Sequence, residues 1–303
     1  MMATRRTTVS FKVASLILVG SCAALSVQAQ DSPLLFADGF ETADLKGWNV
    51  VGENVPAVQD KEARGGRFAL KSPLKFFNGD GASPILRERT EVRARAPNAV
   101  MGREYWYGFS IYLPGPEDGE DSYVPDKYWE IVAQWYAPQD DSSESGRNPP
   151  LTLKTSEDGV GGRWTIGGKY SAKAINTKGD YDGAFSTDLG PYETGKWTDW
   201  VFRVKWSYMN DGLLEVWKDG KKVYSRLNAP IGFNDESGPF FKMGIYKGAW
   251  ELLPEDGSKL DAVKHRVIYH DEFKMADERG SYELVAPGAK DGVPQPPSSV
   301  AVQ

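Results

Sequence analysis

A β-hairpin pattern runs through Leu214-Glu215-Val216-Trp217-Lys218-Asp219-Gly220-Lys221-Lys222-Val223-Tyr224. Apolar and polar residues alternate on both sides of an Asp-Gly dipeptide, which favours the tight turns that join antiparallel strands. Similar short runs recur between clusters of Gly, Pro, Asn and Asp, whereas helical spacing is nearly absent. These runs predict an all-β fold of antiparallel sheets, either a sandwich or a jelly roll, and the fold class expected below is the β-jelly roll sandwich of two antiparallel sheets. They are Phe68–Lys71, Arg87–Arg95, Tyr105–Leu113, Trp129–Tyr136, Trp164–Ile166, Trp197–Trp206, Leu213–Lys218, Lys222–Arg226, Phe240–Tyr246 and Val267–Met275.

Composition narrows the range of partners. The chain has 303 residues, a net charge of −6 and 10 Trp, and its charges are spread without a basic stripe. Nucleic acid is therefore not expected as a partner. All-β sandwiches commonly use more than about 200 residues as one unit, so we expect a single domain over residues 34–286. Residues 287–303 are rich in Pro, Gly, Ser and Lys and are expected to form a disordered tail.

The N-terminus has the pattern of an export signal. Arg5, Arg6 and Lys12 precede an apolar run from Val13 to Leu25. Small residues before position 30 predict cleavage after Ala29, so that residues 1–29 are a signal peptide and the protein is secreted or periplasmic. Oligomeric state is left open by the sequence.

A lipoprotein is the alternative, because Leu18-Val19-Gly20-Ser21-Cys22 resembles a lipobox and would anchor the chain through Cys22. Beyond the signal no run of about 18 apolar residues occurs, so no transmembrane span is expected.

Soft metal ligands are scarce. Cys22 is the only cysteine, and His265 and His270 are the only histidines, which makes a Cys/His zinc site untenable and points to structural roles for both histidines. No cofactor is required for the chemistry inferred below. A structural calcium ion is one possibility, with Asp38, Glu41 and Asp271 as oxygen ligands; ordinary turn acids are the other interpretation.

Three runs could carry chemistry. In Arg89-Thr90-Glu91-Val92-Arg93, alternation places the charged residues on one face and Thr90 and Val92 on the other. Arg87 and Arg95 extend the charged face into a stripe of four arginines. An exposed strand with cross-strand ion pairs is the structural alternative to a solvated binding groove.

The two other runs repeat this arrangement. Gln134 and Tyr136 share a face of one run, and Lys242, Gly244 and Tyr246 share a face of another. The glycine is expected to leave room for a ligand beside the backbone.

Together the three runs resemble, in the same order, the signature strands of jelly-roll alginate lyases: Arg-(Ser/Thr)-Glu-Leu-Arg, Gln-(Ile/Val)-His and Tyr-Phe-Lys-x-Gly-x-Tyr. Over residues 36–285 the chain also resembles the heparin-lyase-like and glucuronan lyase families, through Tyr105–Pro114, Gly195–Trp200 and the Phe240 run. The resemblance implies a concanavalin A-like sandwich with a substrate groove on one concave face, and an anionic polysaccharide as partner.

The resemblance further implies lyase chemistry on a uronic-acid polymer. Elimination requires a group that neutralises the uronate carboxylate, a base for the C5 proton and an acid for the leaving oxygen. Arg89 and Gln134 would neutralise the carboxylate, and Tyr246 would act as base and acid. Because tyrosine titrates near about 10, Arg89 or Lys242 would have to favour its phenolate. Arg93, Glu91, Lys242 and Arg87 would bind substrate.

One departure from the families affects the substrate. Tyr136 stands where they have His, which weakens a mechanism with distinct groups on opposite ring faces. A single tyrosine suits syn elimination, as in glucuronate and mannuronate, so β-1,4-glucuronan is the first expectation. Polymannuronate (alginate) and heparosan or heparin are the alternatives. Tyr136 itself is a second candidate for the base.

Two other function classes were weighed. A glycosidase on such a sandwich needs two flanking acids, and no Glu-x-Asp-x-Glu run occurs. A carbohydrate-binding module could use the same Arg, Gln and Tyr residues to hold an anionic sugar without turnover.

Overall fold

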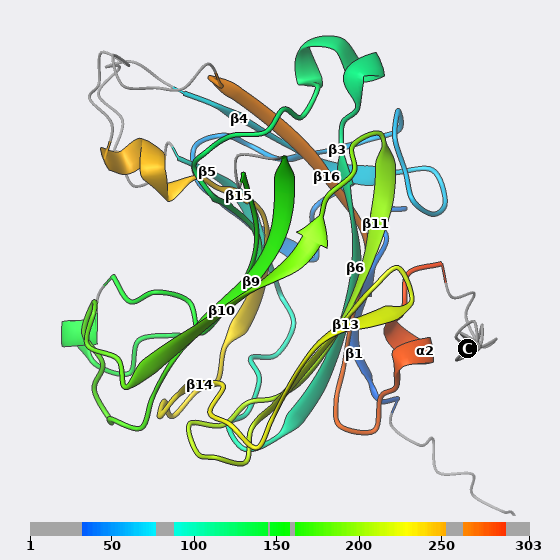
Figure 1. The fold of residues 1–303 in the computed structure, drawn as a ribbon. Helices are drawn as coiled ribbons and strands as arrows, with labels where there is room; N and C mark the ends of the chain where they lie inside the picture. The colour runs from blue at the N-terminus through cyan, green and yellow to red at the C-terminus, as the bar shows by residue number, and fades with distance from the viewer. Residues whose placement is uncertain (1–31, 77–87, 145, 158–160, 253–262, 289–303) are drawn as a thin grey trace, which may run out of the picture. The chain divides into compact units, whose positions relative to one another are not determined.

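Two β-sheets make up most of the described chain, as the alternating runs predicted (Figure 1). The computed structural model describes residues 32–76, 88–144, 146–157, 161–252 and 263–288. The expected signal peptide with Cys22, the residue Arg87 and positions 289–303 of the expected tail lie outside these ranges. Every pair of neighbouring strands is antiparallel except one two-residue pairing, which matches the predicted fold class.

The first sheet, called the back sheet, has the strand order β13-β12-β11-β6-β16-β4-β3, and β1 also pairs with β16. Its long central strands carry the Tyr105–Leu113 and Val267–Met275 runs of the sequence. The bounds are β1 Leu34–Asp38, β3 Ala57–Gln59, β4 Ala69–Lys75, β6 Glu104–Leu113, β11 Lys196–Lys205, β12 Leu213–Lys218, β13 Lys221–Leu227 and β16 His265–Ala276.

The second sheet, called the front sheet, has the order β10-β9-β8-β7-β15-β5-β2, with β14 beside β9. All three runs that were expected to carry chemistry are in this sheet. The bounds are β2 Trp48–Val51, β5 Arg89–Ala94, β7 Glu130–Tyr136, β8 Leu151–Glu157, β9 Gly162–Ser171, β10 Gly183–Pro191, β14 Gly232–Phe233 and β15 Phe240–Tyr246.

Aromatic side chains fill the space between the sheets. Phe241 of the front sheet stacks on Phe273 of the back sheet, with ring centroids 4.4 Å apart. The ring centroid of Trp135 lies 4.7 Å from that of Phe202 and 5.2 Å from that of Phe241. Burial of such a side chain stabilises the fold by about 1.5–3 kcal/mol. The core therefore ties the front sheet to the back sheet directly behind the candidate site.

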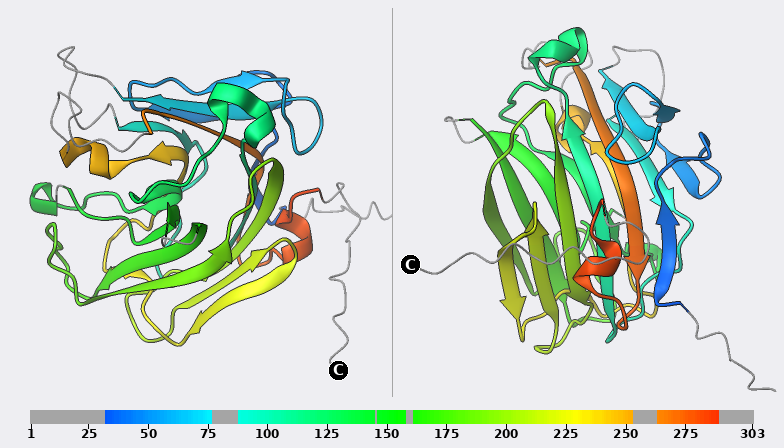
Figure 2. Two further views of the ribbon diagram at one scale, coloured as in Figure 1. Left: turned by 45° about the horizontal axis from the view of Figure 1, so that its top comes forward. Right: turned by 90° about the vertical axis from the view of Figure 1, so that its right-hand side faces the viewer.

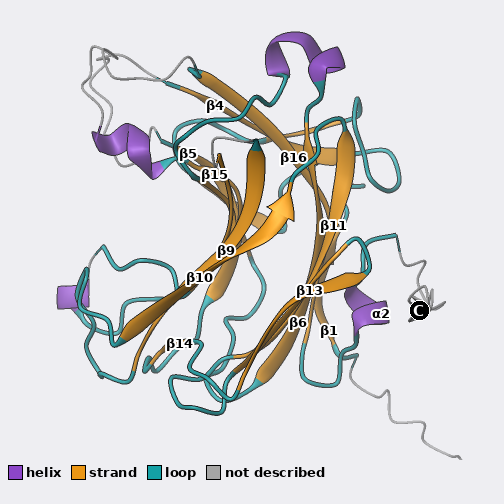
Figure 3. Cartoon of the chain, in the orientation of Figure 1, coloured by secondary structure: helices purple, strands orange, loops and turns teal. Residues whose placement is uncertain are grey.

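The described residues contain four short helices (Figure 3). Three of these are 3₁₀ turns, and the fourth is capped by Ser281, whose hydroxyl accepts a hydrogen bond from the Leu284 backbone N–H at 3.3 Å. Within the described ranges, none of them combines the length and the apolar character that crossing a membrane requires. Their bounds are η1 Pro116–Asp121, η2 Ser142–Glu144, η3 Gly248–Leu252 and α2 Tyr282–Val285.

The sequence patterns located most strands but not all. The Asp219-Gly220 turn has positive φ at both residues, as the hairpin prediction required. Six strands were not expected: β1, β2, β3, β8, β10 and β14. Five of them, all except β8, pair with a single neighbouring strand, where alternation is weak. Figure 2 shows the two sheets from two further directions.

Replacing Phe241 by Ala tests the link between the sheets. The change removes the Phe273 stack and leaves a cavity, so we expect a loss of about 3–5 kcal/mol in the free energy of unfolding, measured by urea denaturation. The control is Leu227→Ala, at an exposed position, with a change within about 0.5 kcal/mol. Equal stability of the two variants would show that this stack does not hold the sheets together.

Candidate active site

The three signature runs form three adjacent strands in the order β7-β15-β5. Register pairs Arg89 with Tyr246, and it pairs Lys242 with Arg93 on one side and Gln134 on the other. Alternation along each strand therefore sets these side chains on the outer face of the front sheet, opposite the core face with Val92, Met243 and Ile245. The strand pairing therefore brings the three runs together on one face of the front sheet.

Glu91 is the centre of a buried polar cluster on this face. Its carboxylate accepts a hydrogen bond from the Gln134 amide and pairs with the Lys242 ammonium at 2.9 Å. The Arg89 guanidinium lies 3.7 Å away. Because a carboxylate only accepts hydrogen bonds, Gln134 must turn its NH₂ group toward Glu91. One acid thus orients an amide and two cations.

The charges in this cluster affect one another. Burial lowers the pKa of Lys242, while Glu91 opposes that shift. Burial also works against the charge of Arg89, but Glu91 and Glu88 outweigh it and raise the Arg89 pKa. Arg89 is therefore held as a cation in a site where a neutral group would otherwise be favoured.

Tyr246 lies against Arg89. The guanidinium carbon is 4.4 Å from the centroid of the tyrosine ring. The Tyr246 ring also packs in a T-shaped arrangement with Trp129, with ring centroids 6.2 Å apart. A Cβ atom at Gly248 would approach the Tyr246 hydroxyl to 2.8 Å, so only glycine leaves the ring its place. The sequence assigned no role to either residue: Trp129 was only the first residue of a predicted strand, and Gly248 is outside every predicted strand.

Tyr136 and Arg93 lie at the opposite end of the cluster. The Lys242 ammonium is 5.2 Å from the Tyr136 ring centroid, and the Arg93 guanidinium is 3.6 Å from that of Phe240. Burial raises the pKa of Tyr136, against the effect of Arg147 and Arg89. The neutral phenol is therefore favoured at this position.

Gly244 serves a different purpose from the one expected. Its φ is +131°, and a Cβ there would lie 2.1 Å from the Thr90 carbonyl oxygen of the neighbouring strand. The register of β15 against β7 shifts between Met243 and Tyr246 at this point. The glycine is thus required by strand packing at a bulge rather than by ligand access.

A second register shift, between β7 and β8 at Ile131 and Ala133, separates Glu130 from Gln134. Glu130 faces the back sheet, where it pairs with Lys247 at 2.6 Å and with Arg266 at 2.6 Å. Asp126 adds a second carboxylate 2.5 Å from Lys247. This buried ion cluster fixes the residue that follows Tyr246, and simple alternation along β7 could not have found it.

A cavity of about 410 Å³ opens on the β7–β8–β9 side of Tyr246. Its lining includes Trp129, Lys154 and Lys169. The two lysines come from β8 and β9, one of which was not predicted as a strand. The candidate site therefore continues along the front sheet beyond the three signature strands.

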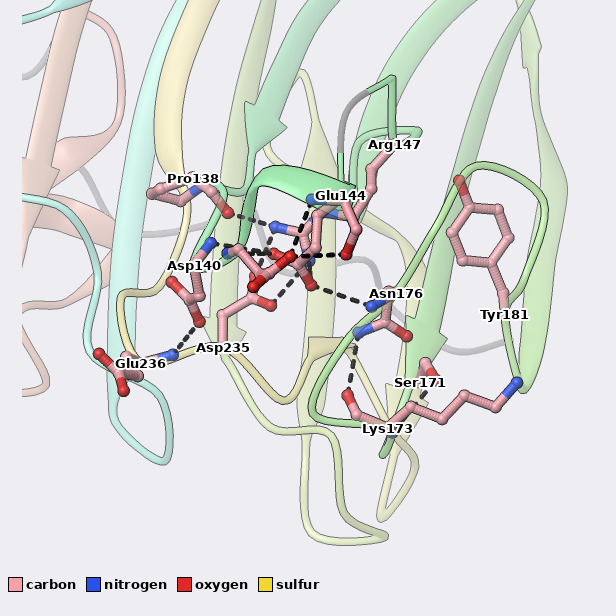
Figure 4. A network of polar contacts seen from close by, with 12 residues as sticks. Pro138, Asp140, Glu144, Arg147, Ser171, Lys173, Asn176, Tyr181, Asp235 and Glu236 are labelled. Carbon is pink, nitrogen blue, oxygen red and sulfur yellow. Dashed lines mark hydrogen bonds and ion pairs between the residues drawn. The ribbon is translucent and has the colours of Figure 1, made fainter.

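Beyond Tyr136, an ion network joins three loops (Figure 4). Arg147 pairs with Glu144 at 3.0 Å and with Asp235 at 2.8 Å, and it also donates to the Pro138 carbonyl. Glu144 in turn accepts the Asn176 backbone N–H at 2.9 Å. Burial raises the pKa of Asp235 to about 6 although Arg147 opposes the shift. The network braces the loops at this end of the front sheet.

The expected calcium ligands all accept backbone or side-chain N–H groups. Asp38 accepts from Phe40 N and Trp48 Nε1, Glu41 from two backbone N–H groups, and Asp271 from three. Across the described residues, no group of three or more His, Cys, Asp or Glu side chains could hold a metal ion. Calcium binding stays a prediction that these contacts do not favour.

The two histidines differ in environment. His270 is fully buried, and its Nε2 contacts the Val132 carbonyl across the core at 2.9 Å. Burial lowers its pKa to about 3, so it is neutral. His265 lies 3.9 Å from Asp121 at the start of β16, on the back sheet. Neither is on the site face of the front sheet.

Comparison with solved structures places the fold. An endo-β-1,4-glucuronan lyase from the fungus Trichoderma reesei matches with a TM-score of 0.64 at 22% identity, over 84% of this chain and 99% of that one. A marine PL-14 alginate lyase from Aplysia kurodai matches with a TM-score of 0.50 at 12% identity, over 77% and 91%. The fold is thus the jelly roll found in polysaccharide lyases. No curated protein matches the chain.

A family model described as polysaccharide lyase matches residues 40–274. This range contains β5, β7 and β15 and nearly all of both sheets. The chain belongs to this family, and it is a polysaccharide lyase.

Replacing Glu91 by Gln tests the centre of the cluster. The change keeps the shape but leaves Lys242 buried without an anion, so we expect a loss of about 3–5 kcal/mol in the free energy of unfolding. The matched control is Glu236→Gln on an exposed loop, with a change within about 0.5 kcal/mol. A Glu91→Gln variant as stable as the parent would contradict the assignment.

Asp235 gives a pH-dependent prediction. Its folded pKa of about 6 lies above the ordinary value of 3.8. Protonated Asp235 therefore contributes to the free energy of unfolding. This contribution is fully present below pH 3.8 and is lost as the pH rises through 6. Urea unfolding should show Asp235→Asn gaining stability relative to the parent over this window. A constant difference between the two proteins would rule out the raised pKa.

Proposed function

We propose that this lyase cleaves β-1,4-glucuronan by syn β-elimination and leaves 4,5-unsaturated uronate ends. The observation that carries the proposal is the Arg89 guanidinium 4.4 Å from the Tyr246 ring, beside the Gln134–Glu91–Lys242 cluster. A fixed cation next to a phenol favours the phenolate that proton abstraction requires. The glucuronan lyase among the structural neighbours supports the choice of polymer.

The reaction follows from these groups. Arg89 and Gln134 neutralise the substrate carboxylate, so that charge developing on it after loss of the C5 proton is stabilised. The Tyr246 phenolate takes the C5 proton. The C4–O4 bond then breaks as the C4–C5 double bond forms, and the same tyrosine returns its proton to O4. One residue can serve both steps when the proton and the leaving oxygen lie on one side of the ring.

The other residues that were predicted to bind substrate differ in how far their side chains are exposed to solvent. Glu91 is 1% exposed and surrounded by donors, so we assign it to holding Arg89, Gln134 and Lys242 rather than to contacting a substrate carboxylate, which it would repel. Lys242 is buried against it. Arg93 is half-buried on the same face and remains a candidate for direct substrate binding.

Tyr136 is the less suitable base. Burial raises its pKa, and Arg89 is stacked on Tyr246 instead. The alternative substrates remain polymannuronate, which shares the syn arrangement, and heparosan or heparin. An exported location, through cleavage after Ala29 or acylation of Cys22, fits an enzyme whose polymer is outside the cell.

The two tyrosines are separated by parallel substitutions. Tyr246→Phe should lower kcat on glucuronan by about 10²–10⁴-fold while retaining polymer binding, because only the proton-transfer group is lost. Tyr136→Phe should stay within about tenfold of the parent. Turnover is followed by the ultraviolet absorbance of the conjugated C4–C5 double bond, and thermal unfolding confirms that both variants fold. The reverse ranking would transfer the base role to Tyr136.

The polymer is identified by the same absorbance with glucuronan, polymannuronate, polyguluronate and heparosan. Glucuronan should give the highest kcat/KM and polyguluronate essentially none, because guluronate requires anti elimination. Turnover of polyguluronate equal to that of glucuronan would contradict the syn mechanism.

A further inference from the structure

The cavity beside Tyr246 is built from residues outside the signature strands. Its volume of about 410 Å³ is within the range of about 300–1,000 Å³ typical of small-molecule sites. Lys154 of β8 pairs in register with Ile131, and Ile131 pairs with Tyr246. The cavity therefore continues the row that starts at Arg89 and crosses Tyr246 toward β8 and β9.

Lys154 and Lys169 have no anionic partner among the residues that the structure describes. No carboxylate among the described side chains lies within ion-pair distance of either one. The other buried lysines of this region differ, because Lys242 pairs with Glu91 and Lys247 pairs with Glu130. Burial, together with the positive charge of Lys169, lowers the pKa of Lys154. In a protein of net charge −6, two lysines that line one cavity and have no ion-pair partner among the described side chains leave a locally positive site.

The walls of the cavity suit a sugar ring. Trp129 is 39% exposed; the centroid of its ring is 6.2 Å from that of Tyr246 and 4.7 Å from the Lys154 ammonium. Gly167 and Gly168 form part of the lining, and a Cβ at Gly168 would lie 2.3 Å from the Pro150 carbonyl oxygen, so the packing of the cavity wall requires glycine there. An aromatic side chain and two ammonium groups around one cavity match a sugar ring that carries a carboxylate.

We propose that this cavity is a subsite for a second uronate, next to the one that reacts at Tyr246, and that Lys154 and Lys169 bind its carboxylate. The inference rests on the proposed function and deepens it. The substrate then carries carboxylates on consecutive sugars, as a homopolymeric uronan does. A polymer that alternates uronate with a neutral hexosamine, such as heparosan, leaves the lysine pair unmatched.

The test uses binding as well as turnover. In a Tyr246→Phe background, Lys154→Met and Lys169→Met should each weaken the equilibrium binding of glucuronan oligosaccharides by about tenfold, since a charge-assisted hydrogen bond is lost while the apolar stem is kept. Lys154→Arg should restore most of the binding. With Tyr246 intact, the lysine variants should raise KM and leave kcat nearly unchanged, and the affinity should depend less on salt.

The matched control is Lys221→Met, an exposed lysine on β13 of the back sheet, which should bind and turn over as the parent does. The parent should also prefer glucuronan over heparosan oligosaccharides of equal length, and the Lys154→Met/Lys169→Met double variant should lose that preference. Undiminished uronan binding or unchanged preference in a correctly folded double variant overturns the subsite.

The outcomes separate this proposal from the elimination mechanism. Weaker binding in the lysine variants supports the subsite even if glucuronan is not turned over, in which case only the proposed reaction fails. If the double variant turns over glucuronan with an unchanged KM, the subsite proposal is wrong and the elimination mechanism stands.

Discussion

The candidate site depends on one buried carboxylate. Glu91 lies between Lys242, Gln134 and Arg89, and each of these would be poorly placed without it. A cation buried without an anion costs several kcal/mol, and an amide without a fixed partner can turn either way. The acid therefore makes it possible to keep positive charge on the face of a sheet whose other side is an aromatic core. The field of that charge extends to the Tyr246 ring.

The backbone around the Glu91 cluster also helps to separate the outer face of the front sheet from its core face. The register shift between Ile131 and Ala133 interrupts the alternation along β7, so that Glu130 points into the sandwich while Gln134, four residues later, points out. Lys247 directly after Tyr246 is held from behind by Glu130 and Asp126. The outer face thus carries the residues proposed for chemistry, and the inner face carries the ions that fix the strand ends.

The sequence was sufficient for the fold class and for the three strands, because alternation and motif spacing are local properties. It did not suffice for β8 or for the cavity, since a lysine in an alternating run looks the same on any solvated face. The position of Lys154 beside the site follows from its pairing with Ile131 across a bulge, and this pairing is a property of the tertiary structure. Gly244 was read as room for a ligand, although the Thr90 carbonyl of the neighbouring strand requires it. Buried Glu130 and Arg266 were invisible for a related reason: each is compensated by a partner distant in the chain.

The Lys247–Glu130–Arg266–Asp126 cluster has a consequence for the history of this sequence. Two cations and two carboxylates are enclosed with nearly balanced charge, so replacing any one of them strands the others in a dry interior. A single substitution at any of these four positions is therefore strongly destabilising, whereas replacing all four together by apolar residues is compatible with the fold. Related chains should inherit the four residues as a set or have lost them as a set, and mixed combinations should be rare.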